Sequence, residues 1–367
     1  MKLQTLSNNS QADFLSSLKN GVHISKQGKN HVQGIAVDEK NGWIYWSFTT
    51  RLVKTDLRGN VVGSVQGLVG HLGCISLCPE NGLVYGSLEF KKDSIGAGIL
   101  KSLGNTGNYE DGFYIAVFDG AKITRTNMSA ENDGIMSAAF LPEVLADYSG
   151  SGKDKNGKTV PHRFGCSGID GVCFAPDAGS ENGKLLCWVA YGVYSDLTRA
   201  DNDHQVLLCF DPNELLKLSA PLSQTAMHRT GSASPYKKYF VFTGNTTYGV
   251  QNLEYSKKDR LLLMAVYRGK KPEYPNYDMF AVDLSKPARF TGLSGTGEKG
   301  DALTLFNAPS PESSEGISGF RFPYGQCGMQ FLSGGELVCA APVGEDGENA
   351  ADLFAFSFDP KNGFEKI

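Results

Sequence analysis

Residues 31–48, HVQGIAVDEKNGWIYWSF, decide the fold of this chain. Two runs of apolar and aromatic residues, 32–37 and 43–48, flank the dipeptide Asn41-Gly42. Such a dipeptide between two strand-like runs is a strong short-range signal for a β-hairpin. Gly34 opens the first run, and small residues are typical of strands that approach other strands closely. The stretch therefore predicts two antiparallel strands, the first with a small residue at its entry.

The same pattern returns four more times along the chain. Each copy has a glycine-rich entry, a short strand, a tight turn, a strand of apolar and aromatic residues, and a third strand that usually closes on Asp. The five units open at His31, His71, Gly165, Gly249 and Gly325. Strands that run outward from an axis, with small residues on the innermost one, build a propeller blade. The repeat predicts an all-β propeller with five four-stranded blades, with six or seven blades as the alternative count.

Composition supports this class. The 367 residues include 44 Gly, 21 Phe and 15 Tyr, which suits many short strands and tight turns. We expect residues 31–367 to form one propeller domain, and residues 1–30 to form an N-terminal segment in which 22–25 supply a closing strand. A β-sandwich is the competing fold, but its strands do not need a glycine-rich entry in every unit.

Charge and cysteine usage exclude several classes of function. The net charge is -4 and no long run of one sign occurs, which disfavours nucleic-acid and membrane partners. The first residues lack the apolar core of a secretory signal, so a cytoplasmic protein is expected if Met1 is the native start. The eight cysteines include no CxxC pair and mostly lie in apolar runs, so we expect them to be reduced core residues.

The blade pattern over residues 31–360 resembles the β-propeller superfamily, and a five-blade count resembles the glycosidase and fructosidase propellers. Four strings are similar to a bacterial propeller group from which no function carries over: Gly70–Cys74, Gly192–Tyr194, Asn245–Asn252 and Tyr267–Lys270. The five-bladed glycosidases carry acidic residues on inner strands, one of them at the start of the first blade. Gln33 stands at that place here, so the resemblance does not imply their mechanism.

Blade topology indicates where function should gather. The start of an inner strand and the end of the second strand lie at the same rim, and the long loops leave from that rim too. We call it the first rim, and we expect a binding pocket there and simple turns at the opposite rim. The candidate substrate-binding residues at the first rim are His31, Gln33, Tyr191, Tyr194, Arg199, Tyr248, Gln251, Asn252, Tyr267, Arg268, Lys270 and Gln326.

Acids and imidazoles at the same rim are the candidate catalytic residues. They are Asp170, Glu89, Asp201, Asp203, His71 and His162. Two carboxyl groups can supply the acid and the nucleophile or base of a glycosidase, and imidazole serves as an acid, a base or a metal ligand. No cofactor and no metal ligand set are assigned, although a divalent metal ion is compatible with these imidazoles.

The leading hypothesis is a glycoside hydrolase that acts on a small or oligomeric sugar. The first alternative is a uronate-type polysaccharide lyase, in which Arg199 or Arg268 neutralises the substrate carboxylate. The others are a non-catalytic propeller that binds a glycan or a protein, and a metal-dependent, lactonase-like hydrolase. A nucleophile elbow, a P-loop, a dinucleotide fingerprint and an HExxH motif are all absent from the sequence, so the corresponding chemistries lose support.

Overall fold

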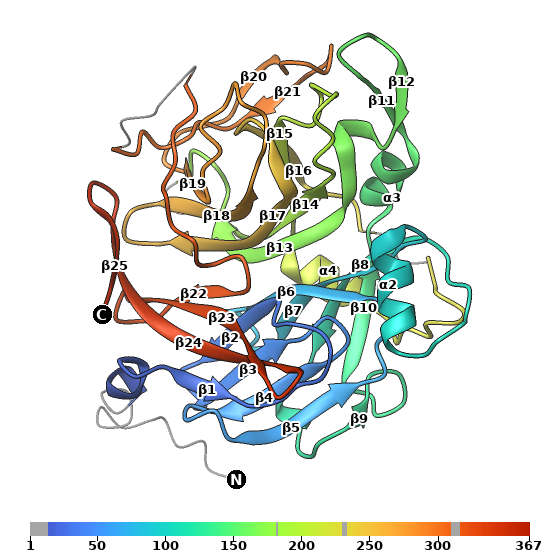
Figure 1. Ribbon diagram of the computed structural model, residues 1–367, viewed down its shortest axis with the longest axis vertical. Helices are drawn as coiled ribbons and strands as arrows, with labels where there is room; N and C mark the ends of the chain where they lie inside the picture. Colours follow the sequence, from blue (N-terminus) through green and yellow to red (C-terminus); the bar gives the residue numbers. More distant parts are fainter. Residues whose placement is uncertain (1–13, 181–182, 230–232, 310–315) are drawn as a thin grey trace.

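The computed structural model describes residues 14–180, 183–229, 233–309 and 316–367. Its strands form a ring of five sheets, which confirms the five-bladed β-propeller predicted from the repeat (Figure 1). The innermost strand of each blade carries the entry of one sequence unit: β2 (Gly34–Asp38), β6 (His71–Leu77), β13 (Cys166–Pro176), β17 (Thr246–Ser256) and β22 (Met329–Phe331).

The first two blades follow the predicted up-and-down order. Blade 1 continues from β2 through β3 (Trp43–Ser47), β4 (Leu52–Asp56) and β5 (Val61–Gln66), with β9 (Met128–Ser129) added parallel to β5. Blade 2 continues from β6 through β7 (Val84–Phe90), β8 (Gly112–Phe118) and β10 (Met136–Phe140).

A hairpin that follows blade 4 in the sequence is part of the sheet of blade 3. Blade 3 continues from β13 through β14 (Leu185–Val193), β15 (His204–Phe210) and β16 (Lys237–Phe242), and is extended by β21 (Lys299–Ala302) and β20 (Arg289–Gly292). Blade 4 continues from β17 through β18 (Leu261–Arg268) and β19 (Met279–Asp283). In the described residues, β19 is flanked by two isolated bridges, Met279 to Phe320 and Val282 to Leu305. The hairpin that follows blade 4 in sequence is thus built into blade 3.

Blade 5 is completed by both ends of the described chain. Its strands β22, β23 (Leu337–Glu345) and β24 (Glu348–Asp359) are antiparallel. The free edge of β24 pairs with β1 (Val22–Ile24) along residues 351–353 and with β25 (Gly363–Lys366) along residues 356–359. The expected strand from residues 22–25 is therefore present as β1. Strand β25 pairs with another part of the same edge of β24.

The remaining elements lie in the connections between strands. They are the helices α2 (Ser94–Ser102), α3 (Pro142–Ser149) and α4 (Pro212–Leu218), the 3-10 turns η1 (Gly120–Lys122) and η2 (Arg163–Gly165), and the hairpin of β11 (Ser151–Lys153) and β12 (Thr159–Pro161). Within the described ranges, no helix is long and apolar enough to cross a membrane.

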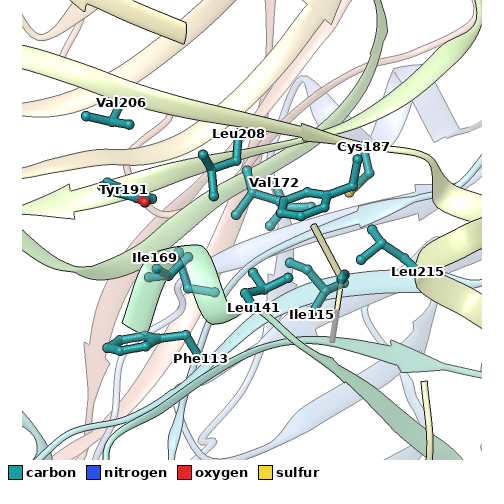
Figure 2. Close-up of a cluster of buried hydrophobic side chains, with 14 of the residues drawn as sticks. Phe113, Ile115, Leu141, Ile169, Val172, Cys187, Tyr191, Val206, Leu208 and Leu215 are labelled. Carbon is teal, nitrogen blue, oxygen red and sulfur yellow. The ribbon is translucent and has the colours of Figure 1, made fainter. Parts of the chain in front are cut away.

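The core consists of five apolar clusters, one between each pair of neighbouring blades. Figure 2 shows the cluster between blades 2 and 3, where Ile115 of β8 and Leu141 face Val172 of β13. A twisted sheet has two faces, and in a ring each face meets another sheet, so strand residues pointing either way are buried. This is why β3, β7 and β8 are buried at nearly every position. All eight cysteines are free and buried, as expected.

Glycine lets the inner strands approach closely around the axis. A Cβ on Gly34 would lie 2.7 Å from the backbone nitrogen of Ile75 in blade 2, and one on Gly328 would lie 2.8 Å from that of Ile35 in blade 1. Gln330 then joins blade 5 to blade 1 through two hydrogen bonds with the backbone of Val37, at 2.7 and 2.9 Å. The glycine-rich entries of the repeat are thus required by the closing of the ring.

Candidate functional site

Three of the candidate catalytic residues meet where blades 2 and 3 adjoin at the first rim. His71 opens β6 and is paired in register with Glu89, which is next to last in β7. Asp170 lies in β13, within the irregular pairing between Ile169 and Val172. Such irregularities bend a strand and re-aim its side chains. Glu89 follows His71 by 18 positions in the sequence, and Asp170 follows Glu89 by 81. The blade topology brings the three residues together from β6, β7 and β13.

The distances define a compact polar cluster, which we call the rim cluster: His71, Glu89, Lys91, Asp170 and Gln251. Nδ1 of His71 lies 3.5 Å from Oε1 of Glu89 and 3.7 Å from Oδ1 of Asp170. Nζ of Lys91 lies 2.5 Å from Oε1 of Glu89. Nε2 of Gln251, from blade 4, donates to Oδ2 of Asp170 at 3.3 Å. Three blades therefore contribute to one cluster.

Glu89 is held rigidly on the protein side of the cluster. Its Oε2 accepts a hydrogen bond from the backbone nitrogen of Ile169 at 2.9 Å, and its side chain is only 3% exposed. Gly168 has φ +121, and a Cβ there would lie 1.8 Å from the same oxygen. The left-handed glycine therefore makes room for the carboxylate. Because both oxygens are engaged by the protein, Glu89 is placed to position its neighbours.

Lys91 lies between two carboxylates and a carbonyl. Nζ donates to the carbonyl oxygen of Ser167 at 2.6 Å and lies 3.7 Å from Oδ2 of Asp93. Asp93 caps α2 by accepting from the backbone nitrogen of Gly96, and it also accepts the hydroxyl hydrogen of Tyr194 at 2.7 Å. The ammonium group of Lys91 thus lies between the carboxylates of Glu89 and Asp93, where a cation would otherwise bind. In the described residues, no group of three His, Cys, Asp or Glu side chains is arranged to hold a metal ion.

Burial and charge set the protonation of the cluster. Burial raises the pKa of Asp170 to about 7, against the lowering effect of His71. Burial also opposes ionisation of Glu89, but Lys91 and His71 lower the pKa of Glu89 below its ordinary value. For His71, burial is outweighed by Glu89 and Asp170, which raise its pKa. At neutral pH the cluster therefore contains an ionised Glu89 and a proton that Asp170 and His71 both attract.

A second group of candidates lines the axis beside the cluster. Nε2 of Gln33 lies 3.2 Å from Nε2 of His31, and burial together with the charge of His71 lowers the pKa of His31. Asn252 donates to the carbonyl oxygens of Gln33 and Gln326, both at 2.9 Å. These amides join blades 1, 4 and 5 at the rim.

Tyr248 is the exposed aromatic residue of this region. Tyr248 is 46% exposed, and its backbone φ angle is +65°. Its carbonyl oxygen accepts from Nε2 of Gln251 at 3.1 Å, which connects it to Asp170. A bulky residue in the left-handed region is strained by about 1–2 kcal/mol.

Other predicted residues have different surroundings. Arg199 is 3% exposed and forms a two-armed ion pair with Asp201, at 2.7 and 2.8 Å. Asp203 pairs with Lys271 at 2.5 Å and accepts from Tyr274 at 2.9 Å. These contacts order the loop between β14 and β15 and its contact with blade 4. They do not bring Asp201 or Asp203 into the rim cluster.

The remaining candidates are distributed around the cluster. Tyr191 is fully buried in the cluster of Figure 2, where its hydroxyl donates to Asp147, so it faces the core and not the rim. His162 packs between the rings of Tyr148 and Tyr194, and its Nδ1 contacts the carbonyl oxygen of Tyr148. Further contacts are Arg268 with Asp278, Tyr267 with Cys327, and the backbone of Lys270 with Asn245.

Sequence reasoning missed the role of Lys91 and of Ser87. Lys91 follows the end of β7 by one residue, in the loop that leaves the first rim. Ser87 lies two residues before Glu89 and shares its face of β7, because side chains alternate along a strand. Because Ser87 and Glu89 are two positions apart on one strand, their spacing predicts that both side chains point toward blade 3.

Two cavities among the described residues differ from the expected distribution of pockets. One of about 10 Å³, lined by His71, Glu89, Lys91 and Ile99, lies at the rim cluster and has room for about one water molecule. One of about 620 Å³ lies at the opposite rim, lined by residues of β14, β15 and α4 that include Leu186, Phe210 and Glu214. The simple turns expected there are thus accompanied by a larger hollow beside α4.

No family model and no curated protein matches the chain. Solved structures are similar in outline. A GH43 β-1,3-galactosidase is 11% identical, with 94% of this chain and 98% of that chain covered and a TM-score of 0.43. The PQQ domain of pyranose dehydrogenase from Coprinopsis cinerea is 13% identical, with coverage of 90% and 83% and a TM-score of 0.36.

A third similar structure is the calcium-binding protein regucalcin from Agrobacterium tumefaciens, which is 12% identical, with coverage of 91% and 95% and a TM-score of 0.32. Similarity at this level is too low to carry an activity from any of these proteins to this chain.

Proposed function

We propose that the protein is a glycoside hydrolase that acts on a small or oligomeric sugar at the first rim, with Asp170 as its general acid. The observation that carries the proposal is the position of Asp170. Its side chain is 13% exposed, it lies 3.7 Å from Nδ1 of His71, and burial raises its pKa to about 7. A carboxyl group that keeps its proton near neutral pH can protonate a leaving oxygen.

The reaction needs one proton to leave Asp170 and one to return. Asp170 donates its proton to the glycosidic oxygen as the bond from that oxygen to the anomeric carbon breaks, and the carbon gains positive charge. A water molecule then bonds to this carbon and loses a proton to the Asp170 carboxylate. The carboxyl group ends in its starting state, so no second catalytic carboxylate is needed for the proton balance.

The other members of the rim cluster set the charge of Asp170. Glu89 is ionised and engaged by Lys91 and Ile169, so we assign it to positioning His71. His71 stabilises the Asp170 carboxylate that forms after proton donation, because their atoms are only 3.7 Å apart. Gln251 orients the second oxygen of Asp170 from blade 4.

Sugar binding is assigned to the exposed aromatic and amide groups beside Asp170. Tyr248 offers a ring face at the rim, and an aromatic face suits the apolar side of a sugar ring. Gln33 and His31 can bond sugar hydroxyl groups from blade 1. The uronate lyase alternative has less support, because Arg199 and Arg268 already neutralise Asp201 and Asp278.

The test is hydrolysis of a panel of aryl glycosides by the purified protein. We expect turnover of at least one glycoside, and loss of about 10²- to 10⁴-fold in Asp170→Asn. The matched control is Asp196→Asn, which changes an acid in the loop after β14 whose carboxylate accepts from the backbone nitrogen and hydroxyl of Thr198. Turnover of this control should stay within about twofold of the native protein. Equal turnover in Asp170→Asn and the native protein would contradict the assignment, and no turnover of any glycoside would overturn the function.

A further inference from the structure

Ser87 is the starting point of a second assignment at the rim cluster. The residue is 0% exposed, and its Oγ has no hydrogen-bond partner among the described residues. Leaving a buried hydroxyl without a partner costs about 1–3 kcal/mol, so buried unpartnered groups call for an explanation.

The oxygens of Ser87 and Asp170 approach one point, above the Cα of Gly73. A Cβ built on Gly73 would lie 2.6 Å from Oγ of Ser87 and 2.3 Å from Oδ1 of Asp170. Glycine is required at position 73 for this reason, since any side chain would displace both oxygens. Gln251 bonds the other oxygen of Asp170, so Oδ1 is the one directed toward Ser87.

His71 supplies the third polar atom. Its Nδ1 is buried and also lacks a hydrogen-bond partner in the part of the chain that the structure describes. The 3.7 Å between Nδ1 and Oδ1 of Asp170 is too long for a direct hydrogen bond. Oδ1 of Asp170 therefore lies beside an unpartnered hydroxyl on one side and an unpartnered imidazole nitrogen on the other. A buried water typically makes two to four hydrogen bonds to such groups.

We propose that Ser87, Asp170 and His71 bind one water molecule, and that this molecule is the water consumed in the hydrolysis. The assignment rests on the proposed function for its second part only. Ser87 is then a positioning residue: its hydroxyl fixes the water oxygen while Oδ1 of Asp170 takes the proton. The water oxygen bonds to the anomeric carbon, its proton goes to Asp170, and the proton that Asp170 gave earlier stays on the oxygen of the leaving group.

A neighbouring serine provides a matched control. Ser47 of β3 is also 0% exposed and also contacts Gly73, but its Oγ donates to the carbonyl oxygen of Gly73 at 2.6 Å. Ser47→Ala loses a formed hydrogen bond, whereas Ser87→Ala loses none that the protein makes with itself. A structural role alone therefore predicts that Ser47→Ala is the more destabilised variant and that Ser87→Ala is silent.

The first experiment is crystallography of the native protein and of Ser87→Ala, at a resolution that shows ordered water. We expect one water within hydrogen-bond distance of all three atoms in the native protein, and its loss in Ser87→Ala. A native crystal with no water among these atoms overturns the site. This readout needs no substrate, so it stands whether or not the proposed function does.

The second experiment follows the fate of a cleaved aryl glycoside in water containing methanol. We expect Ser87→Ala to lower the rate of hydrolysis by about tenfold and to raise the share of methyl glycoside among the products, with Ser47→Ala unchanged in that share. An unchanged product ratio in Ser87→Ala, with the water seen in the native crystal, overturns its catalytic role and leaves the site. Absence of any cleavage overturns the function and not the water site.

Discussion

Oδ1 of Asp170 lies 3.7 Å from Nδ1 of His71, and the two residues belong to inner strands of neighbouring blades. Each of the two residues affects the pKa of the other. Burial raises the pKa of Asp170, and Glu89 on β7 together with Asp170 raises the pKa of His71. The contact between blades 2 and 3 is thus a chemical unit as well as a packing interface.

The pKa of Asp170 predicts a falling rate above neutral pH. The proposed general acid is active when protonated, so kcat/KM for a cleaved glycoside should be highest below pH about 7 and should fall as Asp170 ionises. The measurement is the pH profile of the native protein and of Lys91→Met. Lys91 lowers the pKa of Asp170, so its removal should move the falling limb to higher pH. A limb that does not move would contradict the coupling.

The same raised pKa predicts a pH-dependent cost in stability. The unfolded chain loses the Asp170 proton near pH 4, whereas the folded protein keeps it to about 7, so stability is lost as the pH rises between these values. Asp170→Asn should therefore be more stable than the native protein at pH 8, by about 4 kcal/mol for a shift of about three pKa units, and the difference should shrink toward pH 4. Urea unfolding at both pH values measures it, and an equal difference at both would be evidence against a buried, protonated Asp170.

Breaking the Glu89 to Lys91 ion pair should be costly. Both side chains are nearly fully buried, and removal of one partner from a buried pair leaves an uncompensated charge, at about 3–5 kcal/mol. Lys91→Met should show this loss in urea unfolding, and Glu89→Gln with Lys91→Met should recover part of it. Lys217→Met, at an exposed pair with Glu214, is the control and should change stability by less than about 0.5 kcal/mol. A double variant as unstable as the sum of the singles would show that the charges do not interact.

The backbone of Tyr248 predicts a difference between two truncations. Tyr248→Ala and Tyr248→Gly both remove the ring, but only alanine keeps a Cβ at φ +65. The glycine variant should therefore be more stable than the alanine variant by about 1 kcal/mol, although glycine is disfavoured in most strands. Thermal unfolding of both variants measures this. Both should bind a sugar ligand more weakly than Tyr248→Phe, which keeps the ring.

Ring closure through Gln330 can be tested apart from the site. Gln330→Leu keeps the side-chain volume but removes two hydrogen bonds to the backbone of Val37, whose polar groups then lose their partner. We expect a loss of about 1–3 kcal/mol in unfolding free energy and little effect on the pKa of Asp170. The matched comparison is Gln27→Leu, in which the side chain of a half-buried glutamine donates only to the carbonyl oxygen of Ser25, two residues away. Equal stabilities of the two variants would contradict a closing role for Gln330.

The fold was predictable from sequence because its signals are local. Asn41-Gly42 predicts a hairpin and Gly34 permits close strand packing. A glycine-rich entry recurs in the later units, and an Asn-Gly or Gly-Gly turn follows in all of them except the fourth. The exchange of β20 and β21 into blade 3 was not predictable, because strand pairing between Tyr239 and Asp301 depends on contacts far apart in sequence. The closing strand near Val22 was expected, but its sharing of β24 with β25 was not.

The candidate site was predictable in part. Strand topology alone places His71, Glu89 and Asp170 at one rim, because a strand entry and a strand exit meet there. Topology does not say which charges neutralise one another. Asp201 could not be separated from Asp170 as a candidate, since the pairing of Asp201 with Arg199 is decided by loop conformation. Nor does topology assign a role to Lys91, whose contact with Glu89 is known only from the structure.

The pairing of β24 with both β1 and β25 has a consequence for synthesis of the chain. Strand β1 is translated long before its partner residues 351–353, so it cannot form this pairing until blade 5 has been made. Sheets of blades 1 and 2 can form earlier, because their strands are close in sequence. The ring can therefore close only after residues 351–353 have been translated, long after blades 1 and 2.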